Sequence, residues 1–198
     1  MIATPNFVNL SPDDYLEIEA NSSIKHEYID GEVYAMAGAT DTHVTIAGNI
    51  FALLRAQVRG SSCRVYISDM KVRIQKAKGE RFYYPDILVT CDPRDRDTPT
   101  YKQFPKLIIE VLSDSTEAFD RGDKFMDYQS IDSLQEYILI NTRHPRLEIF
   151  RRQDDSWLFN TYSLSEDTEY STFHIVSLDF TEKIATIYED VNFNLPEN

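Results

Sequence analysis

The chain has 198 residues, of which 42% are hydrophobic and 12% aromatic, so it is long enough to form one domain with a sizeable core. No apolar stretch approaches the roughly 18 to 20 residues of a membrane span, and residues 1–5 lack the basic and then apolar pattern of a signal peptide, so a cytoplasmic protein is expected. The net charge of −13 disfavours indiscriminate nucleic-acid binding, because such binding depends on cations that neutralise phosphates.

The first third of the chain contains start and stop signals for helices and turns. A serine, a proline and two acids at positions 11–14 predict the N-terminus of a short helix. Asp30-Gly31, flanked by apolar residues, predicts a two-residue hairpin over His26–Met36. Apolar residues at helical spacing then predict a long helix from about Asp41 to Arg59.

Short strand-like runs and one more helix fill the middle of the chain. A charged loop is expected over Asp92–Gln103, and a second helix over about Phe119–Gln129. Beyond residue 145, alternating apolar and polar residues predict an antiparallel extension. The predicted strands before it are Arg64–Ile67, Met70–Ile74, Phe82–Cys91, Leu107–Leu112 and Gln135–Asn141.

This order of elements predicts an α/β fold with a three-layer core, in which a central mixed β-sheet is flanked by helices. The chain contains no repeats or linkers, so a single domain over residues 1–198 is expected. Its core should span about residues 22–152, and its C-terminal β extension about residues 153–198.

Basic residues concentrate in the stretch 55–81, where eight Lys and Arg against two Asp and Glu give a net charge of +6. A solvated face, balanced by the acidic ends of the chain, is at least an equally good interpretation of this stretch. Its cations are Arg55, Arg59, Arg64, Lys71, Arg73, Lys76, Lys78 and Arg81.

The two cysteines, Cys63 and Cys91, are far apart in the sequence and show no CxxC or Cys/His spacing. The sequence therefore predicts neither a disulfide nor a zinc site, and both residues are interpreted as small apolar residues of the core.

Two acidic residues interrupt runs that are otherwise fit for burial: Asp86 in Tyr83–Val89 and Glu110 in Lys106–Ser113. A lone buried carboxylate costs several kcal/mol unless a cation or good hydrogen bonds meet it. Residues two apart on a strand share a face, so if the two strands are neighbours, both carboxylates can reach one ion. With waters and a backbone carbonyl such as that of Val111, they suit a hard divalent cation. Alternatively, one acid is solvated or paired with Lys or Arg.

A longer pattern surrounds the two acids. Pro85-Asp86, followed after a variable loop by Glu110 on an apolar strand, resembles half of the motif of the PD-(D/E)XK nuclease superfamily. The wider pattern closely resembles one branch, the Uma-two family of restriction-type endonucleases. The resemblance runs from roughly residue 11 to residue 150 and is carried by His26-Glu27-Tyr28-Ile29-Asp30-Gly31-Glu32, His43, Tyr84-Pro85-Asp86, Ile109-Glu110-Val111-Leu112-Ser113, Ser115-Thr116, Asp120, Lys124 and Glu136-Tyr137.

The resemblance implies a restriction-endonuclease-like fold, DNA as the substrate, and a magnesium-dependent site in which Asp86 and Glu110 bind Mg²⁺ and Mn²⁺ can substitute. The superfamily pattern places a lysine two residues after the second acid, where this chain has Leu112. In this branch the lysine lies on the following helix, and Lys124 is the matching residue. Lys124 would orient the attacking water or stabilise the transition state. Its competing role is a surface ion pair with Asp120 at i and i+4.

Two further residues are candidates for the site. Nucleases of this superfamily often add an N-terminal glutamate, for which Glu27 is the first candidate and Glu32 or Asp69 the alternatives. His43, near the start of the long helix, either contacts substrate or holds the hairpin by a hydrogen bond, and the second role is favoured.

Other functions stay open at this point. A catalytically degenerate nuclease scaffold could bind a protein partner or dimerise, and the acidic termini suit a basic partner. A metal-dependent hydrolase of another phosphate ester is a third candidate. A homodimer is weakly expected, because edge strands need covering and restriction-type enzymes often work in pairs.

Overall fold

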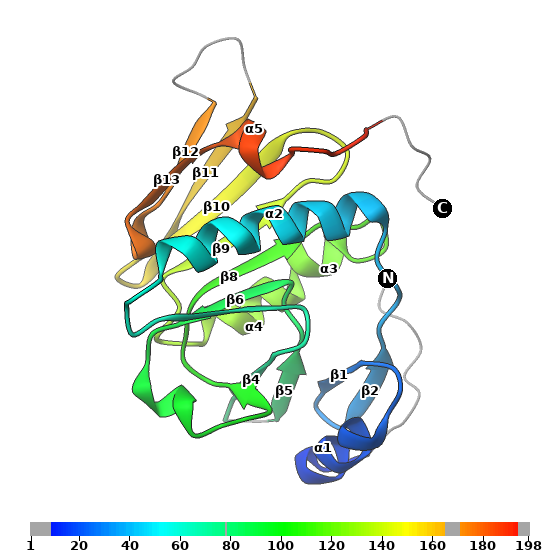
Figure 1. Cartoon of the computed structure of the whole chain (residues 1–198). Coiled ribbons are helices and arrows are strands. Elements are labelled where there is room, and N and C mark those ends of the chain that lie inside the picture. The colour runs from blue at the N-terminus through cyan, green and yellow to red at the C-terminus, as the bar shows by residue number, and fades with distance from the viewer. Residues whose placement is uncertain (1–8, 78, 165–170, 194–198) are drawn as a thin grey trace.

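The computed structural model describes residues 9–77, 79–164 and 171–193 (Figure 1). The helices are α1 (Pro12–Asn21), α2 (Asp41–Gln57), η1 (Pro93–Arg96), α3 (Glu117–Arg121), α4 (Asp123–Gln129), η2 (Val176–Leu178) and α5 (Ile184–Ile187), where η marks a 3₁₀ helix. The strands are β1 (His26–Ile29), β2 (Glu32–Ala35), β3 (Arg64–Ile67), β4 (Lys71–Gln75), β5 (Glu80–Tyr83), β6 (Ile87–Thr90), β7 (Tyr101–Lys102), β8 (Pro105–Val111), β9 (Glu136–Ile140), β10 (Arg146–Gln153), β11 (Ser156–Ser163), β12 (Thr172–Ile175) and β13 (Phe180–Lys183). Residues 1–5, Lys78 and parts of the expected extension lie outside the described ranges.

The N-terminal helix and hairpin form where the sequence predicts them. Ser11 caps α1: its hydroxyl accepts the Asp14 N–H at 3.2 Å, while the Asp14 carboxylate accepts the Ser11 N–H at 3.2 Å. At the β1–β2 turn, Asp30 and Gly31 have φ of +50° and +99°, the left-handed backbone for which Asp-Gly is suited. This hairpin carries Glu27.

The strands form two main sheets and one small sheet. The strand order is β2-β1-β5-β4-β7 in the five-stranded sheet, β11-β10-β9-β8-β6-β3 in the six-stranded sheet, and β12-β13 in the third. Most neighbours are antiparallel, but β8 pairs parallel with β9 and β4 with β7, so both large sheets are mixed. The predicted mixed α/β fold is confirmed, with its strands divided between two sheets.

The predicted strand Phe82–Cys91 is in fact two strands, so the expectation of one continuous strand is wrong. β5 ends at Tyr83 in the five-stranded sheet, and β6 begins at Ile87 in the six-stranded sheet. Pro85 lies between them, and a proline without an N–H cannot continue a hydrogen-bond ladder. The chain therefore passes from one sheet to the other at Tyr84-Pro85-Asp86.

The predicted helix Phe119–Gln129 is likewise divided into α3 and α4. Gly122, with φ −107° and ψ −104°, leaves the helical region between them. The prediction of a single uninterrupted helix is thus wrong, although both helices lie within or next to the predicted range. Within the described ranges, no helix has the length and apolar character needed to cross a membrane.

Alternate residues of the central strands face two different apolar clusters. On β8, Ile109 and Val111 pack in the cluster that contains Ile46 of α2, whereas Ile108 packs in the cluster that contains Phe125 of α4. Accordingly, α2 covers one face of the six-stranded sheet and α3 with α4 covers the other (Figure 1). These are the three predicted layers.

The C-terminal segment, residues 171–193, is part of this core. Phe173, Ile184 and Ile187 belong to the same apolar cluster as the buried residues of α2. The Asn49 side chain of α2 donates hydrogen bonds to the carbonyls of Ile187 at 3.0 Å and Glu189 at 2.8 Å. The segment thereby completes the face of the sheet that α2 covers.

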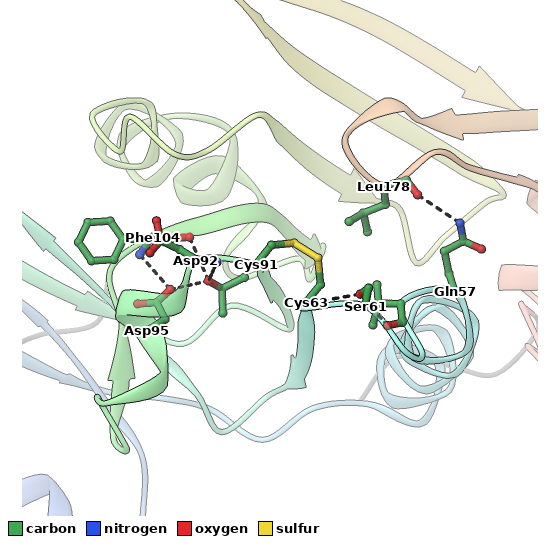
Figure 2. The surroundings of a disulfide bond; sticks show 10 residues. Gln57, Ser61, Cys63, Cys91, Asp92, Asp95, Phe104 and Leu178 are labelled. Atoms are coloured by element: carbon green, nitrogen blue, oxygen red, sulfur yellow. Dashed lines mark hydrogen bonds between the residues drawn. A yellow bond between two sulfur atoms is a disulfide. The ribbon is translucent and has the colours of Figure 1, made fainter.

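The expectation that Cys63 and Cys91 are unpaired is wrong, because the two form a disulfide (Figure 2). The physical reason is the register of β3 and β6, in which Arg64 lies opposite Thr90, so that the residues next to them also meet. The disulfide therefore links the start of β3 to the end of β6, opposite to the end where Asp86 lies.

Candidate active site

The two acids that interrupt apolar runs are neighbours in the structure. In the antiparallel pair β6–β8, Ile87 is the partner of Ile109, so Asp86 and Glu110 come next along the two strands. The Asp86 N–H donates to Glu110 Oε2 at 3.3 Å, and the Val111 N–H donates to Asp86 Oδ2 at 2.7 Å. These two hydrogen bonds hold the two acids next to each other at the start of β6.

Lys124 reaches these carboxylates from α4. Its ammonium Nζ lies 3.0 Å from Glu110 Oε1, 3.2 Å from Glu27 Oε1 and 3.6 Å from Asp120 Oδ1. The side chain is only 7% exposed. Burial by itself lowers the pKa of Lys124, but Glu110, Glu27 and Asp120 outweigh it and raise the pKa well above its usual value. Lys124 therefore carries a positive charge at neutral pH.

Glu110 is deeply buried, with 3% of its surface exposed. The Tyr128 hydroxyl donates to its Oε1 atom at 3.1 Å. Burial raises the pKa of Glu110 well above the usual range, Lys124 opposes this rise, and Asp120 and Asp86 add to it. Burial also raises the pKa of Asp120. In both groups burial therefore disfavours the ionised form of the carboxyl.

Glu27 joins the site from the five-stranded sheet. Its Oε1 atom accepts the Tyr84 N–H at 3.1 Å and lies 3.2 Å from Lys124. Glu27 thus connects β1 both to the crossing between the sheets and to α4.

The two alternatives to Glu27 have other partners. The carboxylate of Glu32 accepts a hydrogen bond from the Tyr34 hydroxyl on the exposed side of the hairpin. Asp69 forms an ion pair with Lys25 at 3.0 Å. Of the three candidate glutamates and aspartates, Glu27 is therefore the one that contacts Lys124.

His43 contacts the site from the first turn of α2. Its Nε2 atom lies 3.2 Å from Asp86 Oδ2. Burial lowers the pKa of His43, but the hydrogen bond and charge of Asp86, with a backbone hydrogen bond to Val111, outweigh burial and raise it. The partner of its ring is thus a residue of the site, whereas the sequence favoured the hairpin.

Two residues of the cluster were not predicted as site residues. Asp120 was considered only as a surface partner of Lys124, yet it is 3% exposed and lies inside the cluster. Tyr128 was not considered, although it stands four residues after Lys124 on the same face of α4. That helical spacing was a signal in the sequence that could have identified it.

The charges of the cluster do not balance without a further cation or protons. Four carboxylates, those of Glu27, Asp86, Glu110 and Asp120, face Lys124 and, when protonated, His43. In the described part of the chain, no three His, Cys, Asp or Glu side chains gather closely enough to hold a metal by themselves. Mg²⁺ needs only one or two carboxylates, with waters as its other ligands. The pair Asp86–Glu110 fits that requirement.

Comparisons with known proteins agree with this fold. A crystal structure titled "a putative nuclease belonging to DUF820 from Anabaena variabilis ATCC 29413" is similar with a TM-score of 0.72 at 15% identity, covering 91% of this chain and 98% of that one. Two proteins of Synechocystis sp. (strain ATCC 27184 / PCC 6803 / Kazusa) are similar in sequence. "Uncharacterized protein slr1290" is 36% identical over 188 residues, which is 94% of this chain and 95% of that protein. "Uncharacterized protein sll1609" is 33% identical over 162 residues, which is 81% and 90%.

The sequence profile of the Uma2 family, described as "Putative restriction endonuclease", matches residues 12–181. That range contains Glu27, Asp86, Glu110 and Lys124 together with the strands and helices that position them. The chain belongs to the Uma2 family of restriction-endonuclease-like nucleases.

Proposed function

We propose that the protein is a magnesium-dependent endonuclease that hydrolyses phosphodiester bonds of DNA. The observation that carries this proposal is the contact of one buried ammonium, Lys124, with Glu110 at 3.0 Å, where Glu110 lies beside Asp86 on the neighbouring strand. Paired carboxylates with an adjacent lysine are the groups that metal-dependent phosphodiester hydrolysis uses.

Asp86 and Glu110 would hold the magnesium ion, which supplies a Lewis acid that lowers the pKa of a bound water and neutralises charge on the phosphate. In the hydrolysis, the water loses a proton to solvent and its oxygen forms a bond to phosphorus, while the bond to the leaving sugar oxygen breaks and that oxygen takes up a proton from solvent. Lys124 donates hydrogen bonds that orient the water or stabilise the negative charge of the transition state. Glu27 and Asp120 hold the ammonium in place from two sides.

A nuclease assay tests this proposal. Supercoiled, linear and single-stranded DNA are incubated with the protein and Mg²⁺, Mn²⁺ or EDTA, beside the variants Glu110→Ala and Asp86→Ala purified in parallel. We expect cleavage by the wild type with either metal and a loss of at least about 100-fold in both variants, as for the removal of one strong transition-state contact. Equal cleavage by wild type and Glu110→Ala would reveal a contaminating nuclease and contradict the proposal.

The alternative is a nuclease scaffold that binds a protein or a second copy of itself. It is favoured by β11, an edge strand of the six-stranded sheet on which Leu158 and Phe159 are exposed. A metal titration separates the two functions. If the site binds magnesium, Mg²⁺ raises the melting temperature of the wild type and leaves that of Asp86→Ala unchanged. No shift in the wild type favours the scaffold.

A further inference from the structure

A second group of cations lies next to the carboxylates but takes no part in their cluster. It consists of Lys25, just before β1, and Lys71, at the start of β4, which approach the ring of Tyr84 with ammonium-to-centroid distances of 5.7 and 5.0 Å. Lys71 is buried and donates to the Tyr84 hydroxyl at 3.0 Å. Lys25 is 40% exposed. The two lysines therefore place positive charge near one aromatic ring, and Lys25 is open to solvent.

The position of Lys25 relative to the site follows from the backbone. Lys25 stands two residues before Glu27, so in an extended strand both side chains project from the same face. Its ammonium donates to the carbonyl of Ser68 at 3.1 Å, and the Ser68 N–H donates to the Asp86 carbonyl at 2.9 Å. Ser68 thus links the ammonium of Lys25 to the backbone of Asp86.

Lys25 also differs from the other cations of the site in what it binds. Lys124 and His43 are largely buried and are occupied by carboxylates of the cluster. Lys25 pairs with Asp69 at 3.0 Å, and Asp69 is 85% exposed. An ion pair with one fully hydrated partner is weak, so another anion can displace Asp69 at little cost. A phosphate diester offers the charge and the acceptor oxygens for that exchange.

We propose that Lys25, supported by the charge of Lys71 next to the Tyr84 ring, binds a backbone phosphate of the DNA strand that lies in the Asp86–Glu110 site. This inference rests on the proposed endonuclease function and adds the residue that positions the substrate strand. In the free protein Asp69 occupies the ammonium, and the phosphate replaces it on binding. Lys25 is therefore a positioning residue, since it contacts a phosphate other than the one that reacts.

The inference predicts opposite effects for the two partners of the ion pair. In anisotropy titrations of a fluorescent DNA duplex, with Ca²⁺ in place of Mg²⁺, Lys25→Met should weaken binding several-fold and lower the slope of log K against log salt by about 1. Lys25→Arg should keep most of the affinity. Asp69→Asn frees the ammonium and should tighten binding.

Arg94→Met is the matched control. Arg94 is 63% exposed and pairs with a neighbouring aspartate, Asp92, at 2.6 Å. It lies beyond the C-terminal end of β6, whereas Asp86 precedes the N-terminal end. The substitution removes the same charge from the whole molecule and should leave affinity and slope unchanged. In cleavage assays with Mg²⁺, Lys25→Met should raise KM with little change in kcat, because it removes a contact present in both ground and transition states.

The outcomes separate this inference from the proposed function. If the wild type cleaves DNA but Lys25→Met matches Arg94→Met in affinity, slope and KM, the phosphate contact is wrong and the endonuclease stands. If Lys25→Met and Asp69→Asn shift binding in opposite directions but the wild type does not cleave DNA, the contact stands and the catalytic proposal fails. A correctly folded wild type that binds no DNA overturns both.

Discussion

Lys124 determines the charge balance of the site. Its ammonium is enclosed by Glu110, Glu27 and Asp120, all within 3.6 Å, and has little contact with water. Removing one partner from a buried ionic group costs more than the group contributes as a whole, because the remaining charges stay buried without compensation. Lys124 therefore has a structural role that is independent of any role in catalysis.

The first prediction concerns this structural role. Lys124→Met should lower the free energy of unfolding at pH 7 by roughly 3 to 5 kcal/mol, since three carboxylates lose their cation. Arg143→Met is the control: Arg143 pairs with Asp114 while both are more than half exposed, so its loss should cost at most about 1 kcal/mol. Urea denaturation of both variants measures the difference. Similar small losses would mean that Lys124 does not balance the buried carboxylates.

A second prediction follows from the raised pKa values of Glu110 and Asp120, whose ordinary values are 4.5 and 3.8. Because their folded-state pKa values are higher, the folded protein keeps protons that the unfolded chain has lost. Their contribution to stability is fully present below about pH 4 and is lost as the pH rises through the folded-state values. Without metal, the free energy of unfolding should therefore contain a component that falls as the pH rises above the ordinary values of these two groups.

Glu110→Gln tests the assignment, because glutamine keeps the shape of the side chain but does not ionise. Urea denaturation at stepped pH should give a flatter profile for this variant than for the wild type. If the two profiles run parallel, the pH dependence arises from other groups.

At the residue scale, the sequence predicts the site best where local geometry alone decides it. The two acids interrupt apolar runs, and the register of β6 and β8 makes Asp86 and Glu110 neighbours. The contact between Lys124 and Glu27 depends instead on how α4 packs against a strand from the other sheet, and no local pattern encodes that distance. The position of Asp120 inside the cluster was not predicted for the same reason, since its burial is a tertiary property.

At the scale of the elements, the sequence signals located α1, the β1–β2 turn and α2, but α5 lies in the C-terminal part where only strands were expected. Two further errors arose where one residue changes the path of the chain. Pro85 divides one apolar run between two sheets, and Gly122 divides one helical run. In both runs the apolar pattern continues through the break, so the periodicity does not reveal it. The disulfide was missed because the register of β3 and β6 pairs residues that are 28 apart in the chain.

The third prediction concerns this disulfide. Replacing both cysteines by alanine should lower the free energy of unfolding by about 3 to 4 kcal/mol, the loop-closure value for a 28-residue separation. Calorimetry of the oxidised wild type, with and without reductant, should show the same loss on reduction, and the double variant should not respond to reductant. Alkylation followed by mass spectrometry provides the check on pairing. Rapid labelling of both thiols in the native, unreduced protein would contradict it.

At the scale of the whole molecule, the C-terminal segment and the central sheet share one core. Phe173, Ile184 and Ile187 are fully or almost fully buried against the residues that α2 contributes. The chain should therefore unfold as one unit, and the site should not survive the loss of the C-terminal segment.

The fourth prediction tests this shared core. Ile187→Ala should cost roughly 2 to 5 kcal/mol, as for a fully buried aliphatic side chain, whereas Val176→Ala, at a residue that is 56% exposed, should change stability by less than about 0.5 kcal/mol. Trp157, the single tryptophan, packs against Phe125 of α4 and reports on the opposite face of the sheet. In each variant, the Trp157 fluorescence and the far-UV circular dichroism of the protein should give the same unfolding midpoint. Separate midpoints would show that the C-terminal segment unfolds independently.

The passage of the chain between the two large sheets at Tyr84-Pro85-Asp86 has a mechanical consequence. Glu110 lies on β8 and Asp86 immediately precedes the neighbouring strand β6, so their spacing depends on the hydrogen bonds between those strands. Glu27 is carried by the other sheet, and its distance to Lys124 varies with the angle at which the sheets meet. A small rotation between the sheets would thus lengthen the contact between Glu27 and the Lys124 ammonium while leaving Asp86 and Glu110 next to each other. The path of the chain through Pro85 therefore links the angle between the sheets to the contacts of Lys124.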